Sequence, residues 1–557
     1  ACRVLSLNRS GKGGAYALSA AAAFKDPPCG WLFSHETVGY RTGAASNVDG
    51  IWQPYKPATY QHRHIPRLRC RLPPFPATHS TMRIKTLAAA CTLAALAGCA
   101  STGPAAPGPR STTPGLAKNV IFFLGDGMGI NTLTAARIYA VGEEGNLAID
   151  TLPESAFVKT FSNDAQVTDS AASMSAYMTG VKQNNGVISM STETLSVSPA
   201  TEGTRTVSRC NNGRAVPTLA ELAKARGMAA GVVTTTSVTD ATPAATYAHA
   251  CTRRLEQDIA AALVPGGAGY NAALGSTGLD LVFGGGAQQF TAIDSGGKRA
   301  DGRNLLGELQ GKGWRVASNT AQLQALAPNA QPVIGLFAQN HFSYEAARDP
   351  VKQPALAEMT AKAIDILANN PNGFFLMVEG GLIDHGLHAT LAKRALQETV
   401  SYNAAIQTAL DKMNKLDPGL KNTLIVATAD HDHTLLINGY SPRTGKTTPT
   451  NAGVLGLVRG LPDGKIRLDK DGAPFTILGF GTGEHRIQGS RKDVKLTDEI
   501  TAGDDYHQEA VVRTRAGAET HGGADVYLGA AGANAELFRG TIDNTRVFDL
   551  IKKAGGL

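Results

Sequence analysis

The sequence predicts an α/β protein, a three-layer α/β/α domain built around a mostly parallel central sheet. From residue 118 onward, continuous apolar segments typical of strands alternate with amphipathic segments typical of helices. Polar residues directly follow several of the apolar segments, as expected where parallel strands end at a common edge. With 557 residues, 43% of them hydrophobic and 18% charged, the chain is long enough for one large domain of this kind.

The expected strands are apolar throughout, because a strand covered on both faces has no solvent-facing side. We expect strands at Val120–Leu124, Ala229–Thr236, Leu279–Phe283, Gly373–Val378 and Thr423–Ala429. Helical periodicity between them predicts helices at Thr218–Arg226, Ala355–Ala368 and about Leu391–Lys415. This alternation favours one sheet with helices on both faces.

The formal net charge of +7 is unevenly distributed. Residues 1–99 carry 12 Lys and Arg against 3 Asp and Glu, whereas the remainder carries 41 against 43. The basic excess therefore belongs to the front of the chain. Since the body is nearly neutral, we expect no nucleic-acid-specific binding.

The first 99 residues resemble upstream sequence followed by an export signal. Residues 1–81 contain no Met and no sustained apolar periodicity. From Met82, two basic residues precede a short apolar run, and Leu96-Ala97-Gly98-Cys99 resembles a bacterial lipobox. We therefore expect translation from Met82, a lipoprotein signal peptide at 82–98, and residues 1–81 as a disordered, non-native extension. A genuine N-terminal extension is the alternative.

The segment 99–117 is rich in Pro, Ser, Thr and Gly, so it is expected to be a flexible linker. A lipid on Cys99 would be the only membrane contact, and the protein would be exported, as a periplasmic or outer-membrane lipoprotein. Beyond Cys99 the chain has only two cysteines, Cys210 and Cys251. In an exported protein this pair suits a disulfide, with two free thiols as the alternative.

The segment VTDSAAS, residues 167–173, places Ser170 near the start of a helix. Free backbone N–H groups at a helix N-terminus favour a phosphate or a serine alkoxide. Taken alone, Asp169 and Ser170 also fit an ordinary helix cap.

Two further segments are rich in Asp, Glu and His, the residue types that commonly bind metals. Residues 379–388, EGGLIDHGLH, hold two carboxylates and two His, and Asp384 and His388 are spaced to share one face of a helix. Residues 428–433, TADHDH, follow an expected strand, where polar residues at this density are costly unless they bind something. A surface charge cluster is the alternative for the first segment.

Two sparser features complete the set. The segment ETHGG, residues 519–523, contains one His, and His521 taken alone is more often a structural residue than a metal ligand. The segment DATP at 240–243 precedes His249 and Arg253, and Arg is a natural bidentate ligand for a phosphoryl group. His249 has no assigned role, because a structural His is the commoner case.

Together, the GDG turn at 125–127, VTDSAAS, TADHDH and ETHGG resemble, in order and spacing, the signature set of the alkaline phosphatase family. The resemblance covers about 118–557, and all of these segments except the GDG turn are specific. It implies hydrolysis of small phosphate monoesters through a phosphoserine on Ser170, with release of inorganic phosphate. Family precedent also implies a homodimer.

The resemblance further implies two Zn²⁺ ions and one Mg²⁺ ion. Carried over position by position, the ligands are Asp384, His388 and His521 for one zinc; Asp126, Asp430 and His431, with Ser170, for the other; and Asp126, Thr242 and Glu379 for magnesium. Arg253 would bind two phosphate oxygens, with Asp169 orienting it, and His433 would lie near the first zinc. Family members vary at the positions of Asp240 and His385, which leaves the third metal's identity and the pH optimum open.

The residues between His433 and His521 contain apolar runs, so we expect folded structure there. They resemble the larger crown-type insertion of animal members, so we expect a crown-like insertion at about 436–516 that is smaller than the main domain, with a long ordinary loop as the alternative. The alternatives to a monoesterase are a phosphodiesterase or sulfatase of the same superfamily, or a lipid-anchored binding protein without turnover. A sulfatase motif would need a Pro that residues 210–214 lack, and the presence of Ser170 favours turnover.

Overall fold

The protein was analysed as a computed structural model that describes residues 115–202 and 205–557. The segments predicted at 1–81 and 82–98, Cys99, and nearly all of the linker 99–117 lie outside the described residues. Among the described residues, no helix has both the length and the apolar character needed to cross a bilayer.

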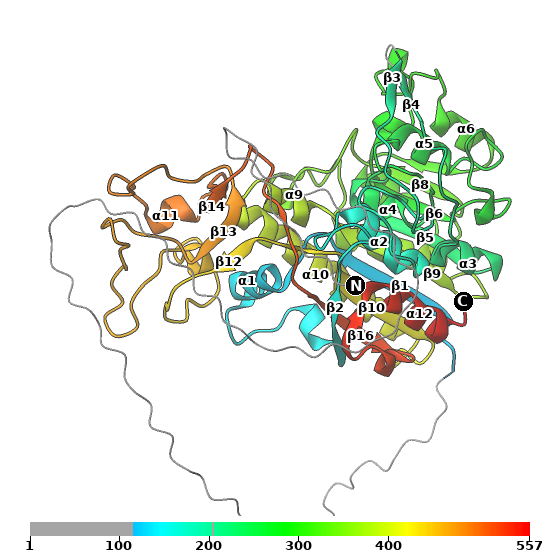
Figure 1. The fold of residues 1–557 in the computed structure, drawn as a ribbon. Helices are drawn as coiled ribbons and strands as arrows, with labels where there is room; N and C mark the ends of the chain where they lie inside the picture. The colour runs from blue at the N-terminus through cyan, green and yellow to red at the C-terminus, as the bar shows by residue number, and fades with distance from the viewer. Residues whose placement is uncertain (1–114, 203–204) are drawn as a thin grey trace, which may run out of the picture. The chain divides into compact units, whose positions relative to one another are not determined.

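A ten-stranded sheet organises the domain (Figure 1). Its strands, in order across the sheet, are β17 (Gly540–Asp543), β2 (Glu154–Lys159), β16 (Val526–Gly532), β10 (Thr423–Ala429), β1 (Asn119–Gly125), β9 (Phe374–Gly380), β5 (Ala229–Ser237), β6 (Leu281–Gly285), β8 (Val333–Leu336) and β7 (Arg315–Ala317). From β10 to β7 every pairing is parallel. β16 runs antiparallel to both β10 and β2.

Helices cover both faces of this sheet, as two neighbouring residues of β1 show. The ring of Phe122 lies 5.5 Å from that of Tyr177 in α2 (Ser170–Thr179), whereas Phe123 lies 6.1 Å from Tyr402 in α10 (Ala392–Leu416). Because successive side chains of a strand point to opposite faces, α2 and α10 lie in different layers. Helices that contact α10 are α1 (Ile130–Val141), α8 (Leu356–Leu367) and α9 (Leu382–His388); those that contact α2 are α3 (Leu219–Ala225), α4 (Ala241–Ala244) and α12 (Asn544–Gly555).

The predicted three-layer α/β/α fold is confirmed, and the predicted strands and helices end within about two residues of the observed ones. The five predicted strands correspond to β1, β5, β6, β9 and β10. All seven residues of β10 are buried, and so are all nine of β5. Burial on both faces explains why these strands were recognisable as unbroken apolar runs.

The structure also contains strands that the sequence analysis did not predict. In β2, exposed and buried residues alternate towards its end, and β16 is largely Gly and Ala. These strands lie at the side of the sheet where the parallel order ends. Alternation over six residues and small side chains are weak signals in a single sequence.

Two small sheets complete the architecture near the segments singled out above. β11 (Asp432–His433) pairs with β15 (His521–Gly522), so that His433 lies opposite His521. Between them, β12 (Leu435–Ile437), β13 (Leu478–Gly483) and β14 (Ala510–Arg513) form a separate three-stranded sheet (Figure 1). The residues between His433 and His521 therefore include folded structure, and both ends of this segment meet at one place.

Candidate active site

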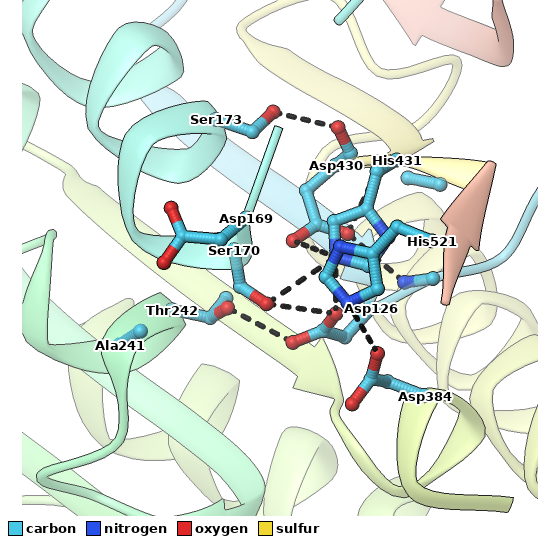
Figure 2. A network of polar contacts seen from close by, with 12 residues as sticks. Asp126, Asp169, Ser170, Ser173, Ala241, Thr242, Asp384, Asp430, His431 and His521 are labelled. Atoms are coloured by element: carbon cyan, nitrogen blue, oxygen red, sulfur yellow. Dashed lines mark hydrogen bonds and ion pairs between the residues drawn. The ribbon is translucent and has the colours of Figure 1, made fainter. Parts of the chain in front are cut away.

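The polar residues predicted from strand ends meet because the strands are in register. Gly125 at the end of β1 pairs with Ala429 of β10 and with Gly380 of β9. Asp126 and Asp430 therefore leave the sheet at the same level as Glu379, which is part of β9. In Figure 2, Asp126, Asp430 and Thr242 of α4 approach one another from separate elements. A parallel sheet delivers side chains to its carboxyl edge in this way.

The turn after β1 brings the backbone close to this edge. The Gly127 N–H donates to Oδ1 of Asp430 at 2.9 Å. Gly127 has a φ of +68°, and a Cβ there would lie 2.5 Å from the His433 ring. Glycine is therefore required at the centre of the GDG turn for both its conformation and its closeness to the site.

Ser170 is the first residue of α2, and its hydroxyl faces the metal-ligand candidates (Figure 2). Its Oγ lies 3.4 Å from Oδ1 of Asp126 and 3.3 Å from Nε2 of His431. Asp169 is the N-cap, and its Oδ1 accepts the Ala172 N–H at 3.1 Å. The cap interpretation therefore holds for Asp169, whereas the Ser170 side chain is directed at the cluster rather than at the backbone.

Buried carboxylates crowd the space beside Ser170. The Thr242 hydroxyl donates to Asp126 at 3.1 Å, yet Oε1 of Glu379 and Oδ2 of Asp430 are buried without a hydrogen-bond partner. Burial and the charge of Asp126 raise the pKa of Glu379 well above its usual value and that of Asp430 to about 8. Such a cluster of like charges favours a cation.

A second group of ligand types lies next to the first. Asp384, His431, His433 and His521 each offer a ligand atom within 4.8 Å of the others, as do Asp126, Asp430 and His431. Nε2 of His388 on α9 lies 3.3 Å from Oδ1 of Asp384 and 3.1 Å from Nε2 of His521. The structure thus brings the predicted metal-ligand residues together around two adjoining centres.

Hydrogen bonds to backbone carbonyls orient both of the outer imidazoles. Nδ1 of His388 contacts the Glu519 carbonyl at 2.5 Å, and Nδ1 of His521 contacts the Thr168 carbonyl at 2.8 Å. Only a protonated nitrogen can donate to a carbonyl, so each Nδ1 carries the hydrogen and each Nε2 is left with a lone pair. The two Nε2 atoms lie 3.1 Å apart beside the Asp384 carboxylate, an arrangement that suits a cation between them. This orientation by a partner on the other ring nitrogen is typical of metal-binding His.

His433 lies where the sequence analysis expected a supporting residue. Its Nε2 contacts Oδ1 of Asp384 at 2.8 Å, and its Nδ1 contacts the carboxylate of Glu519. Burial alone would lower the pKa of His433, but Asp384 and Glu519 raise it to about 10. Glu519 also accepts hydrogen bonds from the backbone and hydroxyl of Thr434. The sequence analysis gave Glu519 no role, although its place two residues before His521 was a usable signal.

Arg253 projects from a loop after α4 and is held by two carboxylates. Its Nη2 donates to Oδ1 of Asp240 at 2.9 Å, and its Nη1 lies 3.4 Å from Oδ2 of Asp169. Burial would raise the pKa of Asp240, but Arg253, His341 and His385 lower it. Asp240 is therefore the closer partner of Arg253, a role that the sequence analysis did not assign.

The loop that carries Arg253 is fixed by covalent and polar contacts. A disulfide joins Cys251 to Cys210, whose Cα atoms are 5.5 Å apart, so the structure contains the predicted disulfide rather than two free thiols. The Arg253 N–H donates to the Gly186 carbonyl at 2.8 Å. His249 contacts Glu221 at 2.7 Å through Nε2 and the Ser189 carbonyl at 2.7 Å through Nδ1. His249, left without a role by the sequence analysis, is a structural residue of this loop.

Comparison with known proteins places the chain among close relatives. The family model described as Alkaline phosphatase matches residues 117–557. The tissue-nonspecific alkaline phosphatase isozyme of Homo sapiens is 37% identical over 464 residues, covering 78% of this chain and 82% of the relative. A membrane-bound alkaline phosphatase of Bombyx mori is 35% identical over 470 residues, covering 78% and 79%.

Solved structures share the fold. The alkaline phosphatase of Thermus thermophilus aligns with a TM-score of 0.56 at 23% identity, covering 81% of this chain and 96% of that one. The alkaline phosphatase of the Antarctic bacterium TAB5 aligns with a TM-score of 0.55 at 23% identity, covering 80% and 99%. At 23% identity, these two structural matches support the fold and not the function.

Replacing His249 by Gln should destabilise the protein in a pH-dependent manner. Burial lowers the pKa of His249, but the contact with Glu221 raises it further, so the net pKa is raised in the folded state. The stabilisation is therefore complete below the unfolded pKa of about 6.5 and is lost as the pH rises through the folded value. The pKa of Glu221 is lowered in the folded state, so the stabilisation that its carboxylate contributes is complete only above the unfolded pKa of about 4.5.

We expect the variant to lose about 2–4 kcal/mol of unfolding free energy near pH 6, because the buried Glu221 loses its partner, and less near pH 9.5. Urea unfolding of the metal-loaded protein at both pH values measures this difference. Glu221→Gln is the matched control and should remove the same pH dependence. An equal loss at both pH values would contradict the ion-pair interpretation.

Proposed function

This chain belongs to the alkaline phosphatase family, and from that membership and the geometry of the site we propose that it hydrolyses phosphate monoesters through a phosphoserine on Ser170, at two zinc ions and one magnesium ion. As a member of this family it is a metal-dependent phosphomonoesterase. The observation that carries the finer proposal is the position of the Ser170 hydroxyl, 3.4 Å from Asp126 and 3.3 Å from His431, at the edge of a buried cluster of metal-ligand types.

The residues present fit the metals. Buried carboxylate oxygens of Glu379 and Asp430 without hydrogen-bond partners are the donors that a cation would engage. The proposed ligands are Asp384, His388 and His521 for one zinc; Asp126, Asp430 and His431 for the other; and Asp126, Thr242 and Glu379 for magnesium. Imidazole with carboxylate suits zinc, and oxygen donors alone suit magnesium.

Bound there, the metals supply Lewis-acid stabilisation of the serine alkoxide and of the leaving oxygen. Arg253 binds two oxygens of the phosphoryl group with its planar guanidinium, and Asp240 and Asp169 hold that guanidinium in place. Ser170 Oγ attacks phosphorus, forming the serine ester and releasing the alcohol. Water then cleaves the ester, which releases inorganic phosphate and restores the hydroxyl.

Nε2 of His521 is free to bind a metal, which supports the assignment of His521 as a zinc ligand. Burial and the neighbouring His431 and His433 hold the pKa of His521 well below its usual value, so the ring is neutral. A neutral imidazole is the form that binds metal.

Ser170→Ala should lower turnover on the order of a thousandfold or more, because the covalent route is lost. Enzyme quenched with substrate at low pH and analysed by mass spectrometry should carry phosphate on Ser170. Ser173→Ala is the control on the same helix and should still give phosphate on Ser170. Phosphate on any other residue of the wild type would refute the assignment.

Removing metals should inactivate the enzyme, and zinc with magnesium should restore it, because no side chain replaces their charge in the cluster. Asp126→Ala should lower the content of both zinc and magnesium, since Asp126 serves two sites. Asp384→Ala should lower mainly zinc.

Metal content per chain, measured by mass spectrometry of the purified variants, tests this assignment independently of activity. The exposed carboxylate of Asp294 provides a control, and Asp294→Ala should retain all metals. Unchanged magnesium in Asp126→Ala would show that Asp126 does not bridge the two sites.

We also propose an exported, periplasmic or outer-membrane location with a lipid on Cys99, and a homodimer. Exposed apolar side chains on β12 and β14, among them Leu436, Val511 and Val512, support burial of the crown-like segment 436–516 between two copies. If Cys99 carries the lipid, Cys99→Ser should move the protein from the detergent phase to the aqueous phase in a partition assay. Unchanged partition would exclude Cys99 as the anchor.

A further inference from the structure

A second polar site lies in the segment between His433 and His521. An open pocket of about 1060 Å³ is lined by Arg486, Arg513 and Arg515, with His485, Glu484 and Ala518 beside them. The arginines come from two stretches, one after β13 and one from the end of β14 onward. The mechanism above uses none of these residues.

The three arginines are not neutralised. Within residues 115–202 and 205–557, the side chains of Arg486, Arg513 and Arg515 make no ion pair or hydrogen bond, and all three are exposed. In contrast, Arg491 in the same segment pairs with both Asp469 and Glu509. The pocket's one carboxylate, Glu484, is already shared between His485 at 3.4 Å and His507 at 3.1 Å. The pocket is therefore net positive.

The pocket adjoins the metal centre of Asp384, His388 and His521. The Thr514 N–H donates to the Gly483 carbonyl at 2.8 Å, which joins the two stretches that line the pocket. Thr482 and Thr520 contact each other at 3.0 Å through their hydroxyls. The Glu519 N–H then donates to the His388 carbonyl at 3.2 Å. Because Ala518 precedes His521 by three residues, the edge of the pocket lies within roughly 10 Å of that ligand.

This position is on the leaving-group side of the reaction. Arg253 and the proposed magnesium ligand Thr242 belong to the stretch 240–253. The pocket is instead lined by residues from 484–488 and 513–518, and the second of these stretches leads directly to His521. Ser170 Oγ lies against Asp126 and His431 of the other centre, so an in-line displacement would place the oxygen of the departing alcohol on the side of Asp384, His388 and His521. A group attached to that alcohol would reach the pocket, while the phosphoryl group stays at Ser170.

We propose that Arg486, Arg513 and Arg515 form a subsite for a second phosphate on the leaving group, so that the enzyme prefers monoesters whose alcohol carries another phosphate. This inference rests on the proposed function. Arginine suits the role because its planar guanidinium binds phosphate oxygens in pairs and stays charged at every working pH.

A divalent cation is the other occupant to consider, because Glu484, His485 and His507 lie within 4.8 Å of one another through their ligand atoms. Two features favour an anion. Nδ1 of His507 is engaged by the Ala389 carbonyl at 2.7 Å as well as by Glu484. Three unpaired guanidinium groups line the same pocket and would repel a dication.

The test compares fructose 1,6-bisphosphate with fructose 1-phosphate, which has one of the same ester bonds and no distal phosphate. Initial phosphate release by the metal-loaded wild type should give a kcat/KM about tenfold higher for the bisphosphate, mostly through a lower KM. Raising the salt from about 0.02 M to about 0.3 M should reduce this ratio, because the subsite is open to solvent.

The triple variant Arg486→Gln, Arg513→Gln, Arg515→Gln should bring the ratio to about two or less, the value expected from two ester groups without a subsite, while hydrolysis of fructose 1-phosphate stays within about twofold of wild type. Arg467→Gln, in the same segment but outside the pocket, is the matched control and should keep the ratio.

The outcomes separate the two proposals. A wild type that hydrolyses p-nitrophenyl phosphate but shows no preference for the bisphosphate would overturn the subsite alone. A triple variant that keeps the preference would also overturn it, as would zinc or another divalent metal bound to the wild type and lost in His485→Ala. A wild type that hydrolyses none of these esters would overturn the proposed function itself.

Discussion

The structure depends above all on one electrostatic constraint: several buried carboxylates share the carboxyl edge of the sheet. Asp126 is 6% exposed, Glu379 1% and Asp430 not at all. Charges of one sign at such depth are costly: burial and the charge of Asp126 raise the pKa of Glu379 and of Asp430. The arrangement is stable in its ionised form only with cations among the carboxylates. A metal ion bound among these carboxylates would therefore stabilise this edge of the sheet as well as serve the reaction.

The neighbouring residues are arranged around that constraint. His388 and His521 donate through Nδ1 to backbone carbonyls, so their other nitrogens face the cluster. The GDG turn adds a backbone N–H to Asp430 and leaves no room for a side chain beside His433. On the opposite side, Asp240 and Asp169 neutralise Arg253. Arg253 is thus held in place by carboxylates beside the cluster, where its guanidinium can bind an anionic phosphate.

The sequence allowed five of the seven strands in the parallel part of the sheet to be predicted, because those strands are buried on both faces; β7 and β8, of three and four residues, were missed. β5 and β10 are continuous apolar runs, and the polar residues that end β1, β9 and β10 could be assigned to one edge. β2 and β16 escaped prediction, since partial exposure and small side chains leave little pattern. The contact of Asp240 with Arg253 depends on loop geometry across 13 residues, which no periodicity encodes. The proposed metal ligands, in contrast, were carried over from the family resemblance, whose motifs hold residue types that are unusual beside buried strands.

The architecture also divides recognition of the phosphate from recognition of the alcohol. In the proposed reaction, Ser170, Arg253 and the metal-ligand candidates contact only the phosphoryl group, which is common to every monoester, so they would not distinguish one alcohol from another. Discrimination needs groups that the leaving portion meets. The pairing of β11 with β15 holds both ends of the segment between His433 and His521 at the metal centre on that side. Because those ends are fixed, side chains carried by this segment can be changed without disturbing the buried carboxylates. Selectivity for substrate can therefore change in this segment while the chemistry at the sheet edge stays the same.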